Sequence, residues 1–387
     1  MKRTLGKIVY LSFFGFLLVV VGIVANSEAQ KPPLIKVGQI TDFTNPGIAS
    51  YVVKQRNAAQ MAIKELNTQG GIFGRSLELI VADNKSDATL AISHAKRLKE
   101  QGVIALIAGG TSTEALALGK WSQDEGHIPI IQAYAASDAL NGHPWVFRSF
   151  NDTQVAEISL SIMQKLGKTK VGILHTTLAY GPDAANKTEK NASKFGIQII
   201  GREALEFRAT DATVQAMKLR DAGAEGVILC EYSMGVATFA RALNTIGWRP
   251  PFTSSWGNVY NALAMSSPPT LMDGAIAQSV CDRENPRVKK VLQDYAKFTG
   301  KEGDIDDGIM LGYACVLVLV NAIKEAKSAD NPVAIRDALY KIKMNDLPLG
   351  RKESVLNFTP ERNWLVPNED HTFMVIKGGK LEPFKLK

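Results

Sequence analysis

Residues 103–132 read VIALIAGGTSTEALALGKWSQDEGHIPIIQ, and this stretch decides the fold. It opens with an unbroken apolar run at 103–108, which is typical of a strand buried on both faces. A stretch of helical character follows at 113–125 and ends at Gly126, because glycine commonly terminates helices. Residues 128–132 form a second apolar run. Two buried strands joined by a helix predict a parallel βαβ unit.

The same alternation extends toward the N-terminus. Residues 35–40 and 77–82 predict two further strands. The helix predicted between them ends at Gly70-Gly71, and its apolar face carries Ala58, Met61, Ala62 and Leu66. Residues 88–101 predict another helix, which ends at Gly102. These elements make up a first doubly wound unit at about 34–149.

The pattern restarts after Arg148. Strands are predicted at 170–175, 197–200, 226–230 and 251–254, and helices at 183–195, 211–222 and 234–246. Three helices (286–299, 307–327, 332–343) and two short strands (354–358, 372–377) follow this second unit. The sequence predicts an α/β protein with two lobes joined by short crossing strands. The N-terminal lobe comprises 34–149 and 279–357, and the C-terminal lobe comprises 150–278 and 358–387.

The first thirty residues have the parts of an export signal. Lys2, Arg3 and Lys7 give a positive start, an apolar run fills 8–24, and 27–29 offer small residues to a signal peptidase. The competing interpretation is an uncleaved membrane anchor, because the run reaches the lower limit of spanning length. We expect cleavage near Ala29. Since no cysteine lies near the end of the run, the product is expected to be a free periplasmic protein.

Charge and cysteine content exclude other classes. Removal of residues 1–29 lowers the formal net charge from +7 to +5, and no run of basic residues longer than a short pair remains. A solvated surface is therefore favoured over nucleic-acid binding. Three cysteines are too few for a disulfide framework, and two of them, Cys230 and Cys315, lie in apolar runs as small buried residues do; the third is Cys281.

The sequence contains little that predicts catalysis. It has no G-x-S-x-G, H-E-x-x-H, P-loop or G-x-G-x-x-G motif. The histidines lack metal-ligand spacing: His94, His127, His143, His175 and His371. Three carboxylates, Asp304, Asp306 and Asp307, are expected in a polar loop, but their spacing does not fit a calcium loop. We therefore expect that the protein is not an enzyme and that it has no cofactor and no metal site.

A candidate ligand site follows the strand at 103–108. The sequence there is Gly109-Gly110-Thr111-Ser112-Thr113, which leads directly into a helix. Free backbone N–H groups at a helix start, with hydroxyls beside them, suit a carboxylate. The competing interpretation is an ordinary N-cap, in which Thr111 or Ser112 only bonds its own helix.

Aromatic residues follow several predicted strands. Tyr180, Tyr232 and Trp256 follow the carboxyl ends of predicted strands, where ligands bind in parallel α/β sheets. Tyr51 is expected in the loop after the first strand. Each could be loop packing. Four such residues from both halves of the chain better fit the walls of a cleft between two lobes.

At this point the sequence resembles the type I periplasmic binding proteins of the leucine/isoleucine/valine-binding kind. The resemblance covers essentially all of the chain after the export signal. The stretches that carry it are Ile35–Gly38, Ala62–Asn67, Gly70–Arg75, Leu77–Asp83, Asp124–Gly126, Tyr180-Gly181 and Gly312–Ala314.

The resemblance implies two Rossmann-like lobes joined by three crossing segments that close on a ligand, in a monomer. It implies the permease and ATPase subunits of an ABC importer as partners. In the amino-acid binders of this family a serine and a threonine hold the ligand carboxylate. The serine falls on Ser112, and the threonine's place falls on Ala135, within the segment Ala133–Ser137. Cleft tyrosines of the family correspond to Tyr51, Tyr180 and Tyr232.

One departure from the family pattern bears on the ligand. Amino-acid binders hold the ligand ammonium with a glutamate where this chain has Trp256. Glu231 lies near in sequence and could replace that glutamate, or could face away. We expect a carboxylate-bearing ligand without an obligatory ammonium, such as an aromatic acid, a hydroxycinnamate or a branched oxo-acid. Leucine-type amino acids are the alternative ligand, and a sensor component feeding a separate receptor or kinase is the alternative function.

Overall fold

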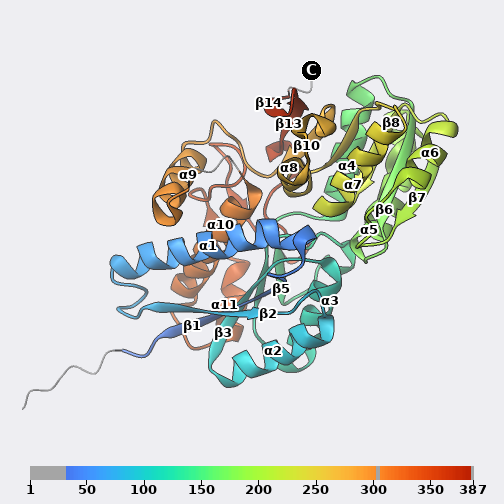
Figure 1. The fold of residues 1–387 in the computed structure, drawn as a ribbon. Coiled ribbons are helices and arrows are strands. Elements are labelled where there is room, and N and C mark those ends of the chain that lie inside the picture. Colours follow the sequence, from blue (N-terminus) through green and yellow to red (C-terminus); the bar gives the residue numbers. More distant parts are fainter. Residues whose placement is uncertain (1–31, 302–305, 385–387) are drawn as a thin grey trace, which may run out of the picture. The chain divides into compact units, whose positions relative to one another are not determined.

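The computed structural model describes residues 32–301 and 306–384; within them, the side chains of Pro46, Gly47, Ser50 and Trp256 are not described. The described strands form two large sheets and one two-stranded ribbon (Figure 1). The predicted export signal at 1–29 lies outside the described residues.

The first sheet is entirely parallel, with the strand order β2-β1-β3-β4-β5. Its central strand β3 is buried at every position, which explains the unbroken apolar run at 103–108. The strands are β1 (Ile35–Thr41), β2 (Leu77–Asp83), β3 (Val103–Ala108), β4 (Ile130–Gln132) and β5 (Val146–Arg148).

Helices cover both faces of this sheet. On one face Val37 and Ile107 share a core with Ala58 of helix α1, and on the other Ile40 and Leu106 share a core with helix α2. Helices α10 and α11 pack on the α1 side although they come late in the sequence (Figure 1). The helices of this lobe are α1 (Pro46–Thr68), α2 (Ala88–Glu100), α3 (Ser112–Trp121), α9 (Pro286–Thr299), α10 (Asp307–Ala326) and α11 (Pro332–Leu339).

The contact between α1 and α10 requires a glycine. A Cβ atom at Gly312 would lie 2.2 Å from the backbone oxygen of Gln55, so no larger residue fits without moving a helix. Helix α10 is long and apolar enough to span a membrane, but 67% of its most apolar window is buried inside the protein. It is therefore a core helix of the first lobe.

The second sheet has the order β14-β13-β10-β9-β8-β6-β7. Strands β6 to β10 run parallel, and β13 and β14 add two antiparallel strands at one edge. The strands are β6 (Lys170–Thr176), β7 (Gln198–Leu205), β8 (Gly226–Cys230), β9 (Phe252–Ser255), β10 (Ala275–Ser279), β13 (Thr372–Lys377) and β14 (Lys380–Pro383). The helices are α4 (Asp152–Lys165), α5 (Tyr180–Ala192), α6 (Thr213–Asp221), α7 (Ser233–Thr245) and α8 (Trp256–Met265).

Within the described residues the chain passes between the two lobes at 149–151, at 280–285 and at 358–371. Two of these segments are bonded to each other, since the Val366 N–H donates to the Ser149 carbonyl at 3.0 Å. The Val280 carbonyl accepts at 2.7 Å from the N–H of Gly350, which lies before the last segment. A ribbon of β11 (Lys343–Met344) and β12 (Leu356–Asn357) lies just before the last segment. The lobe limits given above stay predictions.

The predicted α/β fold with two doubly wound lobes is confirmed. The sequence pattern does not indicate α4 or β5, and the reasons are physical. Strand β5 has only three residues. Helix α4 buries side chains around most of its circumference, so it lacks the single apolar stripe that identifies a surface helix.

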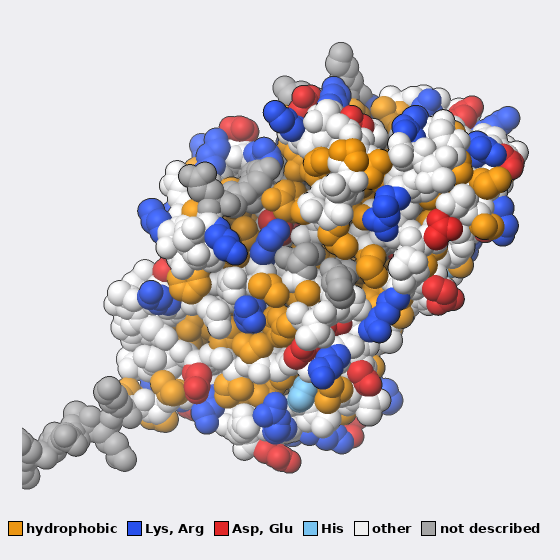
Figure 2. Space-filling view, in the orientation of Figure 1, with side chains coloured by type: hydrophobic (Ala, Val, Ile, Leu, Met, Phe, Trp, Pro, Cys, Tyr) orange, Lys and Arg blue, Asp and Glu red, His pale blue; other side chains and the backbone are white. Residues whose placement is uncertain are grey.

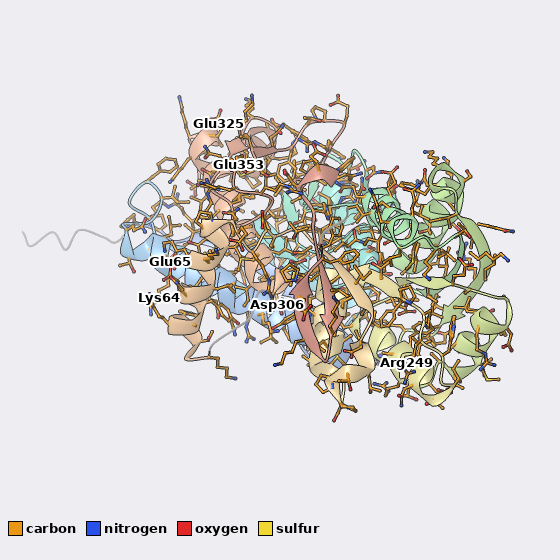
Figure 3. All side chains as sticks on the ribbon, turned by 90° about the horizontal axis from the view of Figure 1, so that it is seen from above. Lys64, Glu65, Arg249, Asp306, Glu325 and Glu353 are labelled. Atoms are coloured by element: carbon orange, nitrogen blue, oxygen red, sulfur yellow. The ribbon has the colours of Figure 1, made fainter. Side chains whose placement is uncertain are left out.

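The prediction that Asp306 and Asp307 belong to a polar loop is wrong. Asp306 caps helix α10 and pairs with Lys54 of α1, and Asp307 is the first residue of α10; both are buried. Figure 3 shows Asp306 beside α1, with Lys64 and Glu65 farther along that helix. Lys54, which lies 252 residues away in sequence, compensates the buried charge of Asp306. No local sequence pattern reveals this pairing. Asp304 lies outside the described residues.

The cysteine prediction is confirmed for Cys230 and Cys315, which are buried. Cys281 is buried as well, and all three thiols are free. Figure 2 shows lysine, arginine, aspartate and glutamate side chains interspersed over one face of the protein, without a basic patch.

Candidate functional site

The loop after β3 forms a tight helix start. Gly110 has φ +117°, a conformation that favours glycine. Thr111 is the N-cap of α3: its side chain accepts a hydrogen bond from the Glu114 N–H, and the Glu114 side chain accepts one from the Thr111 N–H. The capping interpretation therefore holds for Thr111, whose hydroxyl is used inside its own helix.

Ser112 differs from its two neighbours. Its Oγ accepts a hydrogen bond from the Ser137 N–H at 3.2 Å, and the residue lines a buried cavity. Thr113 is exposed and lies outside that cavity; its Oγ1 accepts from the Ala179 N–H at 3.5 Å. Of the three hydroxyl residues named from the sequence, Ser112 alone lines the described cavity.

The cavity at Ser112 brings together residues from both lobes. Four of the predicted site residues line it: Tyr51, Ser112, Tyr180 and Tyr232. Its other described lining residues are Gly110, Tyr134, Ala136, Phe150, Ser255 and Asn258. Tyr134 could have been found from the sequence by the same rule as the other tyrosines, because it lies two residues beyond the end of β4.

The tyrosines form two close pairs. The ring centroids of Tyr51 and Tyr134 lie 4.4 Å apart, and those of Tyr180 and Tyr232 lie 5.6 Å apart. The Tyr51 hydroxyl donates to the Gly110 carbonyl at 3.5 Å, whereas the buried Tyr180 hydroxyl has no hydrogen-bond partner among the described residues. Burial raises the pKa of Tyr180 well above its ordinary value, so the phenol stays protonated and can donate.

Two alanines named from the sequence lie in the protein core. Ala133 belongs to the core on the α1 side of the sheet and donates its N–H to the Ala108 carbonyl at 3.0 Å. Ala135 packs in the core on the α2 side. The residue that presents its side chain to the cavity is Ala136, one position later, because successive side chains point in different directions after the strand.

Trp256 begins helix α8, directly after β9, but its side chain lies outside the described part of the structure. Glu231 is buried beneath the first turn of α7. Its Oε2 accepts from the Tyr232 N–H at 3.2 Å, and a Cβ at Gly235 would lie 2.2 Å from that oxygen. Glu231 does not line the cavity at Ser112, and burial raises the pKa of its carboxyl well above the ordinary value.

One further carboxyl lies close to the α3 start. Glu114 is buried, and burial raises the pKa of its carboxyl to about 7, although the hydrogen bond from the Thr111 N–H favours the charged form. It does not line the described cavity. Among the described lining residues there is no carboxylate and no cation.

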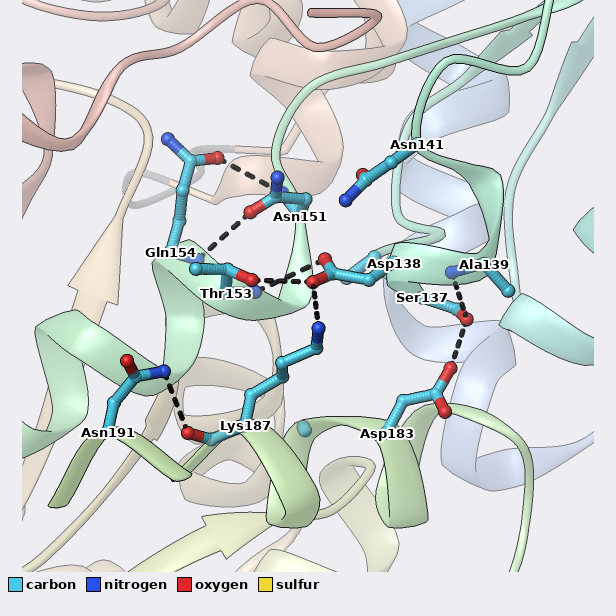
Figure 4. Close-up of polar contacts among 12 residues, drawn as sticks. Ser137, Asp138, Ala139, Asn141, Asn151, Thr153, Gln154, Asp183, Lys187 and Asn191 are labelled. Atoms are coloured by element: carbon cyan, nitrogen blue, oxygen red, sulfur yellow. Dashed lines mark hydrogen bonds and ion pairs between the residues drawn. The ribbon is translucent and has the colours of Figure 1, made fainter. Parts of the chain in front are cut away.

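A polar network joins the two lobes beside the cavity (Figure 4). The Ser137 hydroxyl donates to Asp183 of α5, and Lys187 of α5 pairs with Asp138 at 3.1 Å. Asp138 also accepts from the Thr153 side chain and, at 3.3 Å, from its N–H. The loop that follows β4 is thus bonded to helices α4 and α5 of the C-terminal lobe.

The comparisons with known proteins fit this geometry. Residues 34–366 match the family model described as periplasmic binding protein. The chain belongs to the periplasmic binding protein family. A leucine-, isoleucine-, valine-, threonine- and alanine-binding protein of Pseudomonas aeruginosa is 25% identical over 340 residues, which cover 86% of this chain and 90% of that protein.

Other members of the periplasmic binding protein family are similar over the same length. A Leu/Ile/Val-binding protein homolog of Brucella melitensis is 24% identical, over 82% of this chain and 86% of that protein. A type 1 periplasmic binding protein of Bordetella pertussis superposes with a TM-score of 0.79 at 20% identity, over 91% of this chain and 100% of that one. A leucine-binding protein of Thermotoga maritima gives 0.75 at 20% identity, over 91% and 98%.

These relatives confirm the resemblance to the Leu/Ile/Val-binding kind and the type I periplasmic binding protein fold. They are described as binding proteins, which fits the expectation of a non-enzyme. Within the described part of this periplasmic binding protein, no group of three or more His, Cys, Asp and Glu side chains is placed to hold a metal ion.

Proposed function

We propose that this periplasmic binding protein is the ligand-binding component of an ABC importer for a small carboxylate-bearing ligand. The lobes would close on the ligand and deliver it to the permease. The observation that carries this proposal is the cavity at Ser112, into which a helix start of one lobe and the unpaired Tyr180 hydroxyl of the other converge. Hydroxyl and N–H donors at a helix N-terminus are the groups that bind a carboxylate.

The ligand is expected to lack an obligatory ammonium group. An ammonium buried without a carboxylate partner would lose a charge-assisted hydrogen bond worth about 1.5–3 kcal/mol. No described residue that lines the cavity is acidic, and the Glu231 carboxyl is directed at its own helix start instead. Aromatic and branched acids without an amine fit this lining, since tyrosine and phenylalanine rings form most of its apolar wall.

Binding requires movement of the lobes or of the tyrosines. The enclosed volume among the described side chains at Ser112 is about 20 Å³, whereas one water molecule needs about 10–15 Å³. An acid of amino-acid size therefore enters only when these walls move apart. Two lobes that are joined by short crossing segments are suited to such hinge motion.

A thermal-shift screen tests the ligand class. The protein is unfolded and refolded to remove carried-over ligand, and is then tested with branched-chain and aromatic amino acids beside amine-free aromatic and oxo-acids. A ligand at 100 times its Kd adds about 2.7 kcal/mol to the free energy of unfolding, which raises Tm by several degrees. A shift with amine-free acids supports the proposal. A shift only with leucine-type amino acids contradicts the ligand assignment, and no shift with any acid contradicts the carboxylate site.

Two substitutions test the site itself. Ser112→Ala and Tyr180→Phe each remove one hydroxyl and are expected to weaken ligand binding about tenfold, as for the loss of a hydrogen bond to a charged group. Thr245→Ala is the matched control, because that exposed hydroxyl lies outside the cavity and donates to the Arg241 carbonyl of its own helix. Capture of permease subunits by the ligand-bound protein supports the transport role. Capture of a receptor or kinase instead would favour the sensor alternative.

A further inference from the structure

A second buried cavity adjoins the one at Ser112. The two cavities share Tyr134, Phe150 and Ser255 as walls, so these three residues separate them. The volume of the second cavity is about 20 Å³, which is room for a group of the size of a water molecule or a hydroxyl. Its other walls include Gln278 of β10, Asp307 at the start of α10 and His371 just before β13.

Several polar atoms at this second cavity lack a partner. Both ring nitrogens of His371, the Tyr134 hydroxyl and Gln278 Oε1 are buried and have no hydrogen-bond partner among the described residues. His371 is 3% exposed and Gln278 is 3% exposed. A buried polar group without a hydrogen bond lowers the free energy of unfolding by about 1–3 kcal/mol. Three such side chains around one small cavity therefore indicate that a polar group binds there.

Tyr134 forms part of the wall between the two cavities. Its ring packs on Tyr51, and a Cβ at Gly257 would lie 3.2 Å from its Cε1. A Cβ at Gly308 would lie 3.2 Å from its hydroxyl oxygen, which places that hydroxyl beside the start of α10. The glycines at both positions leave room for the ring, and the phenol is directed away from Ser112 toward the second cavity.

The hydrogen-bonding capacity of the unpaired atoms determines which chemical group can bind in the second cavity. The Tyr134 hydroxyl can donate, Gln278 Oε1 can only accept, and a neutral imidazole at His371 offers one donor and one acceptor. The Gln278 amide is oriented, because its Nε2 donates to the Val155 carbonyl at 3.3 Å and to Ser159 Oγ at 3.1 Å. Burial lowers the pKa of His371 to about 4, so the ring is neutral at pH 7.

We infer that this second cavity is a specificity subsite that receives a hydroxyl group at the end of the ligand remote from its carboxylate. A hydroxyl both donates and accepts, and can thus satisfy Gln278 and Tyr134 or His371 together. A second carboxylate would face the buried Asp307. An ammonium has only donors, so it would leave the Tyr134 hydroxyl proton and the His371 N–H without an acceptor. Asp307 already accepts a hydrogen bond from the Ser279 hydroxyl at 2.8 Å. The inference rests on the proposed function, since the first cavity must hold the carboxylate.

Calorimetric titration of the full chain with matched acids tests this subsite. The pairs are benzoate and 4-hydroxybenzoate, cinnamate and 4-hydroxycinnamate, and 3-phenylpropanoate and its 4-hydroxyphenyl analogue, which vary the distance between the two groups. We expect the hydroxylated member of at least one pair to bind at least tenfold more tightly, as for two or three neutral hydrogen bonds. Equal affinities within every pair would overturn the inference and leave the carboxylate site standing.

Two variants separate the subsite from a structural role. Tyr134→Phe removes only the hydroxyl, and His371→Leu removes the ring donors and acceptors; each is expected to reduce the affinity ratio within the pair to below threefold. The readout is the affinity ratio and not either affinity alone, because Tyr134 also lines the cavity at Ser112. Ser112→Ala is the control, since it should weaken both members of a pair equally. A change in Tm with an unchanged ratio would overturn the inference, and absence of binding by every acid would contradict the proposed function as well.

Discussion

Lys187 Nζ of helix α5 lies 3.1 Å from Asp138 Oδ2, so a cation of the C-terminal lobe pairs with a carboxylate of the N-terminal lobe. One turn earlier on the same helix, Asp183 accepts a hydrogen bond from Ser137. These contacts exist only while the lobes are together, and they lie beside the cavity at Ser112. They therefore stabilise the closed form of the protein even when no ligand is bound.

Lys187→Met is expected to shift the lobes toward an open form. The pair is partly exposed, so its loss should weaken ligand binding by no more than about fivefold. The radius of gyration of the ligand-free protein, measured by small-angle X-ray scattering, should increase. Lys218→Met is the control, because Lys218 pairs with Glu203 inside one lobe. Identical scattering from the Lys187 variant and the unmodified protein would contradict this role of the pair.

Arg148→Met is expected to destabilise the whole fold. The buried guanidinium donates to the carbonyls of Ala136 and Ser137 and to the side chains of Asn141 and Asn363. Its loss leaves these acceptors unpaired, so the free energy of unfolding should fall by about 3 kcal/mol or more. Urea denaturation measures this difference. Arg97→Met, at an exposed position of α2, should change the value by less than about 0.5 kcal/mol.

Glu114→Gln is expected to change the pH dependence of stability. The folded protein raises the pKa of Glu114 to about 7, whereas an unfolded chain has about 4.3. The fold thus favours the protonated carboxyl, and this contribution to stability falls as pH rises from about 4 to about 7. Relative to the unmodified protein, the variant should gain roughly 2–3 kcal/mol between pH 5 and pH 8 in urea denaturation.

The exposed residue Glu125 provides the control for that experiment. Its side chain is 59% exposed, so Glu125→Gln should leave the difference between the two pH values unchanged. If the stability of the Glu114 variant relative to the unmodified protein were the same at pH 5 and pH 8, the raised pKa of Glu114 would be refuted.

Gly312→Ala is expected to disrupt the contact between α1 and α10. The added methyl group would overlap the backbone of Gln55, and neither helix can shift without disturbing the core of the first lobe. We expect a loss of more than about 2 kcal/mol in the free energy of unfolding, measured with urea. Lys324→Ala, at an exposed position of the same helix, should stay within about 0.5 kcal/mol. Equal stabilities of the two variants would contradict the close approach at Gly312.

The sequence predicts the parts of the fold that depend on local periodicity. The buried strand β3, the helix stop near Gly126 and helix α9 follow from patterns of apolar residues and glycine that a single segment carries. The same local reasoning places Tyr180 and Tyr232 after strand ends, and the fold brings them to one cavity with Ser112. Tyr51 lines that cavity too, but it lies in helix α1 and not in the expected loop, because α1 already begins at Pro46. Rules about strand ends succeed here because all parallel strands of a lobe end at the same edge.

The parts that escape prediction depend on contacts between distant segments. Asp306 belongs to a polar stretch of sequence, yet it is buried, because the ion pair with Lys54 compensates its charge. His371 and Gln278 meet beside Asp307 only because the last strands of the chain return to the second sheet. The resemblance to the binding-protein family names Ala135, whereas Ala136 lines the described cavity; which of two adjacent alanines lies there depends on the path of the chain after β4.

The late return of α10 to the first lobe has a consequence for the newly made chain. About 160 residues separate the end of β5 from the start of α10, which covers one face of the first sheet. At synthesis rates of about 5–20 residues per second, that face stays uncovered for roughly 8–30 seconds. The first lobe therefore cannot complete its core while the chain is still emerging. The first sheet thus acquires its second helical layer only after most of the second lobe has been synthesised.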